Sequence, residues 1–311
     1  MNAPLIIGDQ TDLHVIAVCE RMRSSPLILD ARSLKATSFA VDEGGIHVET
    51  ADDSVTIRPD QFGQGWVRRV VPDSWLRSVV ADSREAAEAS GWTTLLAAVL
   101  QFRSVRWLSR IGAITRAENK LVQADVATAL GVSTPRTVVT NSTAMLRQRF
   151  DGDVVVKPLG AGHFSENGEG RVVHAEALAA NALRPDDLGV SPFLIQERLH
   201  ARTHWRVVTV QRRVWVAALD AARFALDWRR DALAHHSFAE LAAPLGLLDA
   251  AQAVAQGLDL GYSSQDWIET DDGLYLLDVN PSGQWMFLPE TIAGQVALAI
   301  AQWLDGEVAD A

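Results

Sequence analysis

Acidic residues near the C-terminal end of the chain have the spacing of a metal site. Residues 266–270 and 274–279 have the composition of two strands, and the Asp-Asp-Gly between them favours a hairpin turn. Centring the hairpin on this turn places Asp266 opposite Asp278, with Asn280 on the same face as Asp278. Facing carboxylates repel, and their hard oxygen atoms suit Mg²⁺. We therefore expect these side chains to bind a divalent cation; the alternative is a solvated acidic turn.

Two lysines are candidates for binding phosphate. Lys157 ends an apolar strand and precedes the glycine-rich segment 158–164, whose backbone N–H groups could approach a phosphate closely. The order differs from that of a P-loop, because the lysine comes before the glycines. Lys120 lies in the first turn of a helix that we expect to begin with a capping box at 115–118 and to end near Gly131. A lysine at that position is either a surface residue or a phosphate ligand.

The next strand, expected at 193–199, is interrupted by the polar residues Gln196 and Glu197. Its backbone could bind the edge of an adenine while apolar neighbours stack on the ring; the alternative is an ordinary buried strand. A hairpin at 204–219 follows and carries Arg206. The guanidinium could face a triphosphate or the carboxylate of an acceptor.

The elements before these motifs indicate an open α/β unit that extends from residue 1 to about residue 108. Thr11 or Asp12 is expected to cap its first helix. A later strand ends with Arg68 and Arg69. We expect this pair either to be solvated or to form an anion-binding rim. None of these features indicates a particular chemistry, so the unit is interpreted as a scaffold.

Composition and charge exclude several classes of function. The chain has 311 residues, of which 48% are hydrophobic and 22% charged, which indicates a globular chain of two or three subdomains. A net charge of −11 disfavours non-specific binding to nucleic acid or anionic membranes. No segment has the features of a signal peptide or the ~20 apolar residues of a membrane span. Cys19 is the only cysteine, so an intramolecular disulfide is impossible and a cytoplasmic location is expected.

Taken in order, these motifs resemble the ATP-grasp ligases over roughly residues 115 to 305. The resemblance implies an α/β (α+β) ATP-grasp fold with the nucleotide held between two α+β lobes. The implied subdomains are an N-terminal domain at 1–112, a central lobe at 113–195 and a C-terminal lobe with the metal site at 196–311. Three segments further resemble the graspetide (microviridin-type) maturases, which crosslink ribosomal peptides. These segments are Asp-Trp-Arg-Arg at 227–230, Asp-Val-Asn-Pro-Ser-Gly-Gln-Trp at 278–285 and Gly-Trp-Val-Arg-Arg at 65–69.

The resemblance assigns roles to individual residues. The ATP site would consist of phosphate-binding lysines, an adenine hinge and Mg²⁺ ligands. These groups are, in order, Lys120 and Lys157; Gln196, Glu197 and Leu199; and Asp266, Asp278 and Asn280. Arg206 would stabilise the transferring phosphate or the acyl phosphate. Asp227 would orient the nucleophile of the substrate peptide, and Arg229 would pair with its carboxylate.

Two positions depart from the family pattern. The family usually has glutamate where Asp278 stands, and the shorter side chain should shift the metal slightly. His204 stands where related ligases tend to have an acidic residue, two positions before the arginine.

These residues suit the activation of a carboxylate as an acyl phosphate, followed by attack of a hydroxyl or amine. We expect a peptide macrocyclase that uses ATP and Mg²⁺ and acts on a ribosomally made precursor with a leader and an acidic core. A homodimer is also considered. One alternative is a ligase that adds free amino acids to a peptide or protein. Others are a catalytically inactive nucleotide- or peptide-binding module, and an α/β protein in which the motifs coincide by chance.

Overall fold

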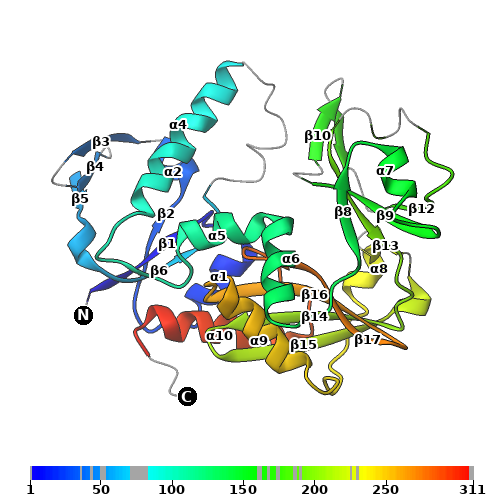
Figure 1. The fold of residues 1–311 in the computed structure, drawn as a ribbon. Coiled ribbons are helices and arrows are strands. Elements are labelled where there is room, and N and C mark those ends of the chain that lie inside the picture. Colours follow the sequence, from blue (N-terminus) through cyan, green and yellow to red (C-terminus); the bar gives the residue numbers. More distant parts are fainter. Residues whose placement is uncertain are drawn as a thin grey trace.

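The described part of the chain forms an N-terminal unit, a central lobe and a C-terminal lobe (Figure 1). The computed structural model describes residues 2–35, 37–42, 45–49, 54–70, 83–159, 163–166, 169–172, 176–184, 188, 191–224, 226–228 and 231–307. The central lobe stands over the C-terminal lobe, and the N-terminal unit lies beside both.

A parallel sheet organises the N-terminal unit, as expected for an α/β segment. Its strand order is β2-β1-β6-β7. The strands are β1 (Ala3–Ile7), β2 (Leu27–Leu29), β6 (Phe62–Val67) and β7 (Arg106–Trp107). The helices are α1 (Leu13–Cys19), α2 (Ala31–Lys35) and α4 (Arg84–Val99). Asp12 caps α1 by accepting a hydrogen bond from the His14 backbone, which confirms that expected helix start.

A small antiparallel meander extends from this unit. It consists of β3 (Ser38–Asp42), β4 (Gly45–Glu49) and β5 (Ser54–Ile57), and a 3₁₀ turn at Pro59–Gln61 leads back into β6. Gly45 has a φ of +134° and lies against the backbone of Ile57, so a side chain there would clash.

Two helices connect the N-terminal unit to the central lobe, α5 (Ile111–Glu118) and α6 (Lys120–Ala129). The expected capping box at 115–118 is wrong, because Thr115 lies inside α5. Asn119 instead caps α6, accepting a hydrogen bond from the Leu121 backbone N–H. Lys120 is therefore the first residue of α6, and Gly131, with a φ of +70°, follows the helix as expected.

The central lobe is built on an antiparallel sheet of order β12-β9-β13-β8. Its strands are β8 (Thr137–Thr140), β9 (Asp153–Pro158), β12 (Glu176–Ala179) and β13 (Phe193–Glu197). The short helix α7 (Thr143–Arg147) and the hairpin of β10 (His163–Glu166) and β11 (Glu169–Val172) complete the lobe. Since β13 is paired on both sides, the expected boundary at residue 195 falls inside a strand of this sheet.

The C-terminal lobe contains an antiparallel sheet of order β15-β14-β16-β17. The strands are β14 (Thr203–Val210), β15 (Arg213–Asp220), β16 (Tyr262–Thr270) and β17 (Gly273–Asn280). The helices are α8 (Ala232–His235), α9 (Leu247–Gly257) and α10 (Glu290–Leu304). Before α9 begins at Leu247, the Ala239 backbone pairs with Ala218 on β15.

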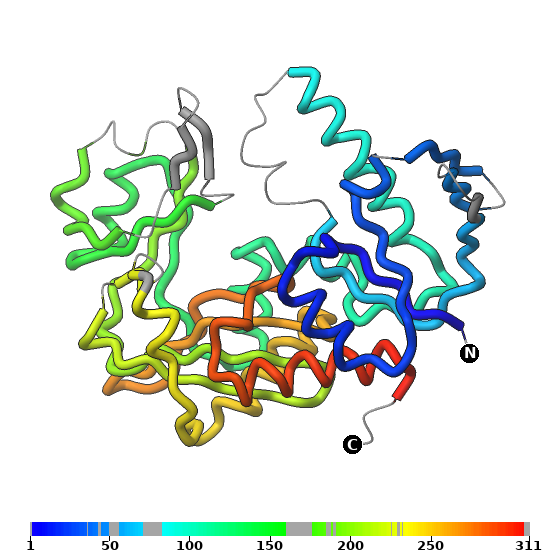
Figure 2. Tube along the Cα trace, turned by 180° about the vertical axis from the view of Figure 1, so that it is seen from behind, coloured from blue at the N-terminus to red at the C-terminus, as the bar shows by residue number. Residues whose placement is uncertain are grey.

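Helix α10 joins the two ends of the chain. Its buried stripe of Ile292, Val296 and Ile300 belongs to one apolar core with Val15 and Val18 of α1 and with residues of β14 and β15. Figure 2 shows α10 beside the first helix of the chain. Within the described residues, no helix is long and apolar enough to cross a membrane.

Candidate functional site

The β16–β17 hairpin contains an irregularity that determines its register. The turn consists only of Asp271 and Asp272, since Thr270 pairs with Gly273. A register shift follows farther along, where Leu277 is the extra residue of a β-bulge. After the bulge, Asp266 pairs with Asp278, as the sequence predicts. The predicted pairing is thus reached through a shorter turn and a compensating bulge.

A polar row crosses this sheet on one face. Arg206 of β14 pairs in register with Asp266 of β16, which pairs with Asp278 of β17. Arg206 Nη1 donates to Asp266 Oδ1 at 2.8 Å, and both residues are buried. Lys120 Nζ lies 2.6 Å from Asp278 Oδ1 at the other end. Two cations therefore flank two carboxylates in a line across the lobe.

Lys120 reaches this row because α6 is docked onto β17. Gln123, one turn along the helix, donates from its amide nitrogen to Val279 O at 2.8 Å and accepts from Val279 N at 2.9 Å. Both contacts are buried, so they hold the start of the helix against the end of the strand. The sequence reasoning did not identify Gln123, which has no local motif.

The oxygen ligands present fit Mg²⁺. Asp266, Asp278 and Asn280 lie at the end of the hairpin, and carboxylate and amide oxygens are the donors this ion prefers. Asp278 is half-buried rather than sealed. Among the described residues, no group of three or more His, Cys, Asp or Glu side chains forms a metal cluster. A metal at Asp278 would compete with Lys120, whose ammonium would then have a phosphate as its alternative partner.

A cleft lies between the central and C-terminal lobes, with about 350 Å³ of empty space, part of it open to solvent. Its lining comes from α6, β8, β13, β17 and the connection before β8. The lining residues are Lys120, Gln123, Ala124, Thr134, Thr137, Leu194, Gln196, Leu276 and Leu277. Leu194, Leu276 and Leu277 line this cleft together with Lys120, so apolar and cationic side chains border the same space.

The other residues expected to bind ATP differ in their position relative to this cleft, whose lining includes Gln196. Lys157 Nζ donates to Gln196 Oε1 at 2.7 Å, so both lie at the same side. Glu197 accepts from the Arg136 backbone N–H at 2.7 Å, away from the cleft lining. Leu199 follows β13 and is half-buried. The glycines of the predicted phosphate loop lie outside the described residues.

Asp227 stands beside an anchored aromatic cluster. Its neighbour Trp228 is buried and packs against Phe238 and Phe287, with ring centroids 5.0 and 5.8 Å away. The Arg206 guanidinium lies 5.7 Å from the Phe287 ring. The loop expected to contact substrate is therefore linked to the polar row through Phe287. Arg229 lies outside the described residues.

His204 is half-buried on β14, two residues before Arg206. Side chains alternate along a strand, so His204 and Arg206 share a face of the sheet. The role of His204 stays a prediction.

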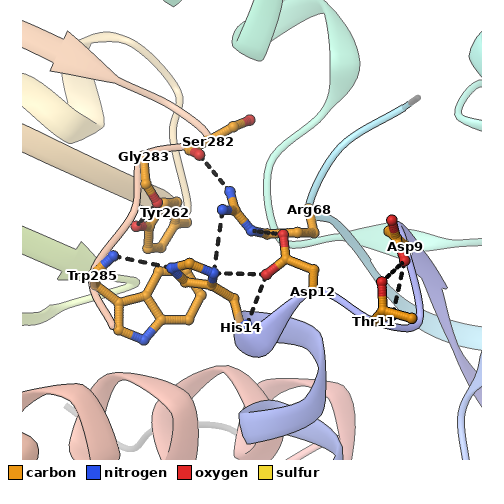
Figure 3. Close-up of polar contacts among 9 residues, drawn as sticks. All are labelled: Asp9, Thr11, Asp12, His14, Arg68, Tyr262, Ser282, Gly283 and Trp285. Carbon is orange, nitrogen blue, oxygen red and sulfur yellow. Dashed lines mark hydrogen bonds and ion pairs between the residues drawn. The ribbon is translucent and has the colours of Figure 1, made fainter. Parts of the chain in front are cut away.

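A second buried polar cluster joins the N-terminal unit to the loop after β17 (Figure 3). Arg68 is 2% exposed, so neither expectation for it, solvation or an anion-binding rim, is correct. Its Nε pairs with Asp12 Oδ2 at 3.1 Å, and its Nη1 donates to Ser282 O at 2.5 Å. His14 Nε2 accepts from the Trp285 backbone N–H at 3.2 Å.

The protonation states of this cluster follow from its contacts. Burial alone would raise the pKa of Asp12, but the hydrogen bond with His14 and the charge of Arg68 outweigh it and hold the pKa at about 2. Burial lowers the pKa of His14, and Arg68 lowers it further. Neutral His14 can accept from Trp285 at Nε2, so its Nδ1 carries the proton and donates to Asp12 at 2.7 Å. The role of Asp12 as a helix cap could be predicted from the sequence. No local sequence motif indicated its ion pair with the distant Arg68.

Comparisons with known proteins were made for the whole chain. No protein-family model matches it, and no curated protein matches it in sequence. Solved structures do match. A RiPP-associated ATP-grasp ligase from Chryseobacterium gregarium, solved with ADP and a leader and core peptide, has a TM-score of 0.84 and 20% identity, covering 99% of this chain and 98% of that chain.

Two further structures show the range of the similarity. The macrocyclase MdnC from Microcystis aeruginosa MRC, bound with precursor peptide MdnA, has a TM-score of 0.80 and 18% identity over 98% of this chain and 99% of that chain. A RimK domain ATP-grasp protein from Sphaerobacter thermophilus DSM 20745 has a TM-score of 0.60 and 15% identity, covering 97% of this chain and 98% of that chain. The similarity includes the N-terminal unit as well as both lobes. The chain therefore has the α/β architecture of the ATP-grasp fold.

Proposed function

We propose that this protein is an ATP-dependent ligase that activates Asp or Glu side chains of a ribosomally made precursor peptide and closes macrocyclic esters or amides. The observation that carries the proposal is the polar row of Arg206, Asp266 and Asp278, which meets Lys120 beside the cleft between the lobes. Similarity over nearly the full length to ligases solved with precursor peptides supports the choice of substrate.

The site residues divide into those that hold ATP and those that hold the acceptor. Lys120 and Lys157 would bind phosphate, and Gln196 would border the adenine. Asp266, Asp278 and Asn280 would hold Mg²⁺, which supplies positive charge to the phosphate oxygens when it is bound. Arg206 has a buried Nε without a hydrogen-bond partner among the described residues. An anionic oxygen of a phosphate would satisfy that donor.

The reaction would proceed in two steps, activation of the carboxylate and ring closure. A substrate carboxylate attacks the γ-phosphorus of ATP and releases ADP, forming an acyl phosphate. A Ser or Thr hydroxyl or a Lys amine of the same peptide then attacks the acyl carbon, and phosphate leaves. Each crosslink thus removes one water from the peptide. Asp227 would orient the nucleophile and Arg229 would hold the acidic side chain before activation.

The finer features of the partner belong to the same proposal. The peptide would have a leader and an acidic core, because the reaction needs a substrate carboxylate close to the cations that flank the polar row. The enzyme would act in the cytoplasm, where precursor and ATP are both made, and a homodimer would be its assembly.

Intact mass spectrometry of precursor peptides encoded beside the gene tests the proposal. Incubation with the full chain, ATP and Mg²⁺ should remove one water mass per crosslink, and omission of ATP should prevent the change. A gain of amino-acid residue masses would instead identify a ligase that adds free amino acids. An unchanged peptide, together with nucleotide binding but no turnover, would overturn the macrocyclase proposal in favour of a binding module.

A further inference from the structure

The Ser282–Trp285 loop directly follows the polar end of β17, and side chains from separate parts of the chain hold its backbone. On the sheet side, Tyr262 donates from its hydroxyl to Gly283 O at 2.8 Å, and Arg206 Nη2 donates to Gln284 O at 3.0 Å. Burial raises the pKa of Tyr262, so the hydroxyl keeps the proton that it donates. On the other side, Arg68 and His14 hold the ends of the loop.

The backbone of one residue, Ser282, connects Arg68 to a candidate metal ligand. The carbonyl of Ser282 accepts from Arg68, while the N–H of Ser282 donates to Asn280 Oδ1 at 2.9 Å. An amide oxygen has two lone pairs, so Asn280 can accept this hydrogen bond and still bind a cation. The position of Ser282 therefore sets the direction of the Asn280 side chain.

The loop has little freedom to move away from this position. A Cβ added at Gly283 would lie 2.5 Å from Ser264 Cβ and 3.1 Å from Arg206 Nη2. Ser264 is also the register partner of Asn280 on β16. The loop is thus packed directly on the strand that faces Asn280, and a displacement of its backbone would be transmitted to that residue.

Asp12 and His14 make Arg68 rigid. One carboxylate oxygen of Asp12 pairs with Arg68 Nε and the other accepts from His14 Nδ1. The helix α1 fixes Asp12 as its cap, and His14 is buried with its ring edge against Trp285 at 4.4 Å between centroids. A guanidinium held at both edges presents its remaining N–H groups in one direction.

We propose that Arg68, oriented by Asp12 and His14, is a positioning residue for Asn280, so that the N-terminal unit completes the metal end of the nucleotide site. The inference rests on the proposed function for the identity of the ligand, a Mg²⁺–nucleotide. It adds residues that lie outside both lobes and that do not touch the nucleotide cleft. Their effect is exerted through the backbone N–H and C=O of Ser282.

Isothermal titration calorimetry tests this role. ADP is titrated into the full chain, once in the presence of Mg²⁺ and once in the presence of EDTA. Arg68→Met should weaken binding of Mg²⁺–ADP by about 10–100-fold, the usual effect of losing a group that orients a metal ligand. Binding of ADP in EDTA should remain at the wild-type value. Equal losses in both conditions would show a merely structural role, and no loss in either would also overturn the inference.

Arg106→Met is the matched control. Arg106 also joins the N-terminal unit to the C-terminal helix, with its guanidinium 4.5 Å from the Trp303 ring, but it does not contact the loop. This variant should bind Mg²⁺–ADP like the wild type. A wild-type chain that binds no ADP in either condition would overturn the proposed function itself, which separates that failure from failure of the inference alone.

Variants at His14 provide a second test if Arg68→Met does not fold. His14→Gln retains an acceptor for the Trp285 N–H, whereas His14→Ala does not. The Mg²⁺-dependent part of ADP affinity should fall in His14→Ala and be largely restored in His14→Gln. Equal Mg²⁺ dependence in both variants and the wild type would overturn the inference.

Discussion

The Ser282–Trp285 loop is held on each side by a buried arginine that pairs with an aspartate, and the two pairs differ in what surrounds them. On the N-terminal side, Asp12 binds both Arg68 and His14. On the sheet side, Asp266 binds Arg206 but also faces Asp278 across the ladder. Both arginines donate to a carbonyl of the same loop.

This difference in surroundings indicates different roles: Arg68 and Asp12 support the candidate site, whereas Arg206 and Asp266 are part of it. Asp12 has a cation and a neutral donor as partners, so the pair on that side is electrostatically complete. The sheet side has two facing carboxylates, so it retains capacity for a cation, which Mg²⁺ would supply.

The strongest test of this contrast removes each arginine in turn. Arg68→Met should lower the free energy of unfolding by ~3 kcal/mol, the lower end of the loss for a buried ion pair, because it leaves the half-buried Asp12 carboxylate without its cation. Arg206→Met should also destabilise the chain, but Mg²⁺ should recover part of that loss by replacing the positive charge beside Asp266. Denaturant unfolding with and without Mg²⁺ measures both effects. Equal recovery of the two variants would contradict the contrast.

Removing a carboxylate from the sheet side should abolish most of the catalysis. Asp266→Asn should lower ATP turnover by roughly 10²–10³-fold, the scale expected when a preorganised charged group is lost. Steady-state ATPase assays with peptide substrate measure this change. Asp271→Asn is the control, since Asp271 lies in the turn of the same hairpin with 85% of its side chain exposed. Comparable losses in the two variants would refute a specific role for Asp266.

A methyl group at Gly283 tests how tightly the loop is packed between its two arginines. Gly283→Ala should cost about 1–3 kcal/mol of unfolding free energy, because its Cβ would overlap Ser264. Gly152→Ala should have little effect, since a Cβ there meets no atom within 4 Å. Thermal unfolding compares the two, and a tolerated Gly283→Ala would mean that the loop can move freely.

The smallest expected effect concerns pH. Burial lowers the pKa of His14, so below its ordinary value the unfolded chain binds a proton that the folded chain does not, and stability falls as pH falls. Asp12 acts at lower pH: its pKa of about 2 means that its contribution is lost only as pH falls below the ordinary value of 3.8 towards 2. His14→Gln should therefore flatten the unfolding free energy between pH 7 and pH 5 by about 1 kcal/mol. An unchanged slope would show that His14 is not buried neutral.

Features controlled by local chemistry could be predicted from the sequence. The caps at Asp12 and Asn119 illustrate the range: Asp12 was one of two caps expected for its helix, whereas a capping box at 115–118 was expected and Asn119 was not foreseen. Both patterns are plausible locally, and docking of α6 on β17 decides between them. The hairpin pairing of Asp266 with Asp278 was correct although the bulge at Leu277 was not foreseen.

Contacts between distant parts of the chain were beyond local reasoning. Arg68 lies 214 positions before its partner Ser282, and no spacing rule relates them. Its neighbour Arg69 has the same side chain but is half-buried. Only the fold distinguishes the two, so the role of Arg68 becomes visible only in three dimensions. The ATP-grasp fold could be predicted from the sequence because the motifs that resemble this fold follow one another along the chain.

The shared core of α1 and α10 has a consequence for how the protein is made. Ribosomes synthesise the N-terminal unit first, but the α1 surface that includes Val15 and Val18 is covered by residues of α10, near the other end of the chain. During translation this apolar surface stays open until α10 has emerged from the ribosome. Asp305 then accepts hydrogen bonds from the backbone of Arg23 and Ser24, closing the chain on itself. The nascent chain thus covers the apolar surface of α1 only after α10 has been synthesised.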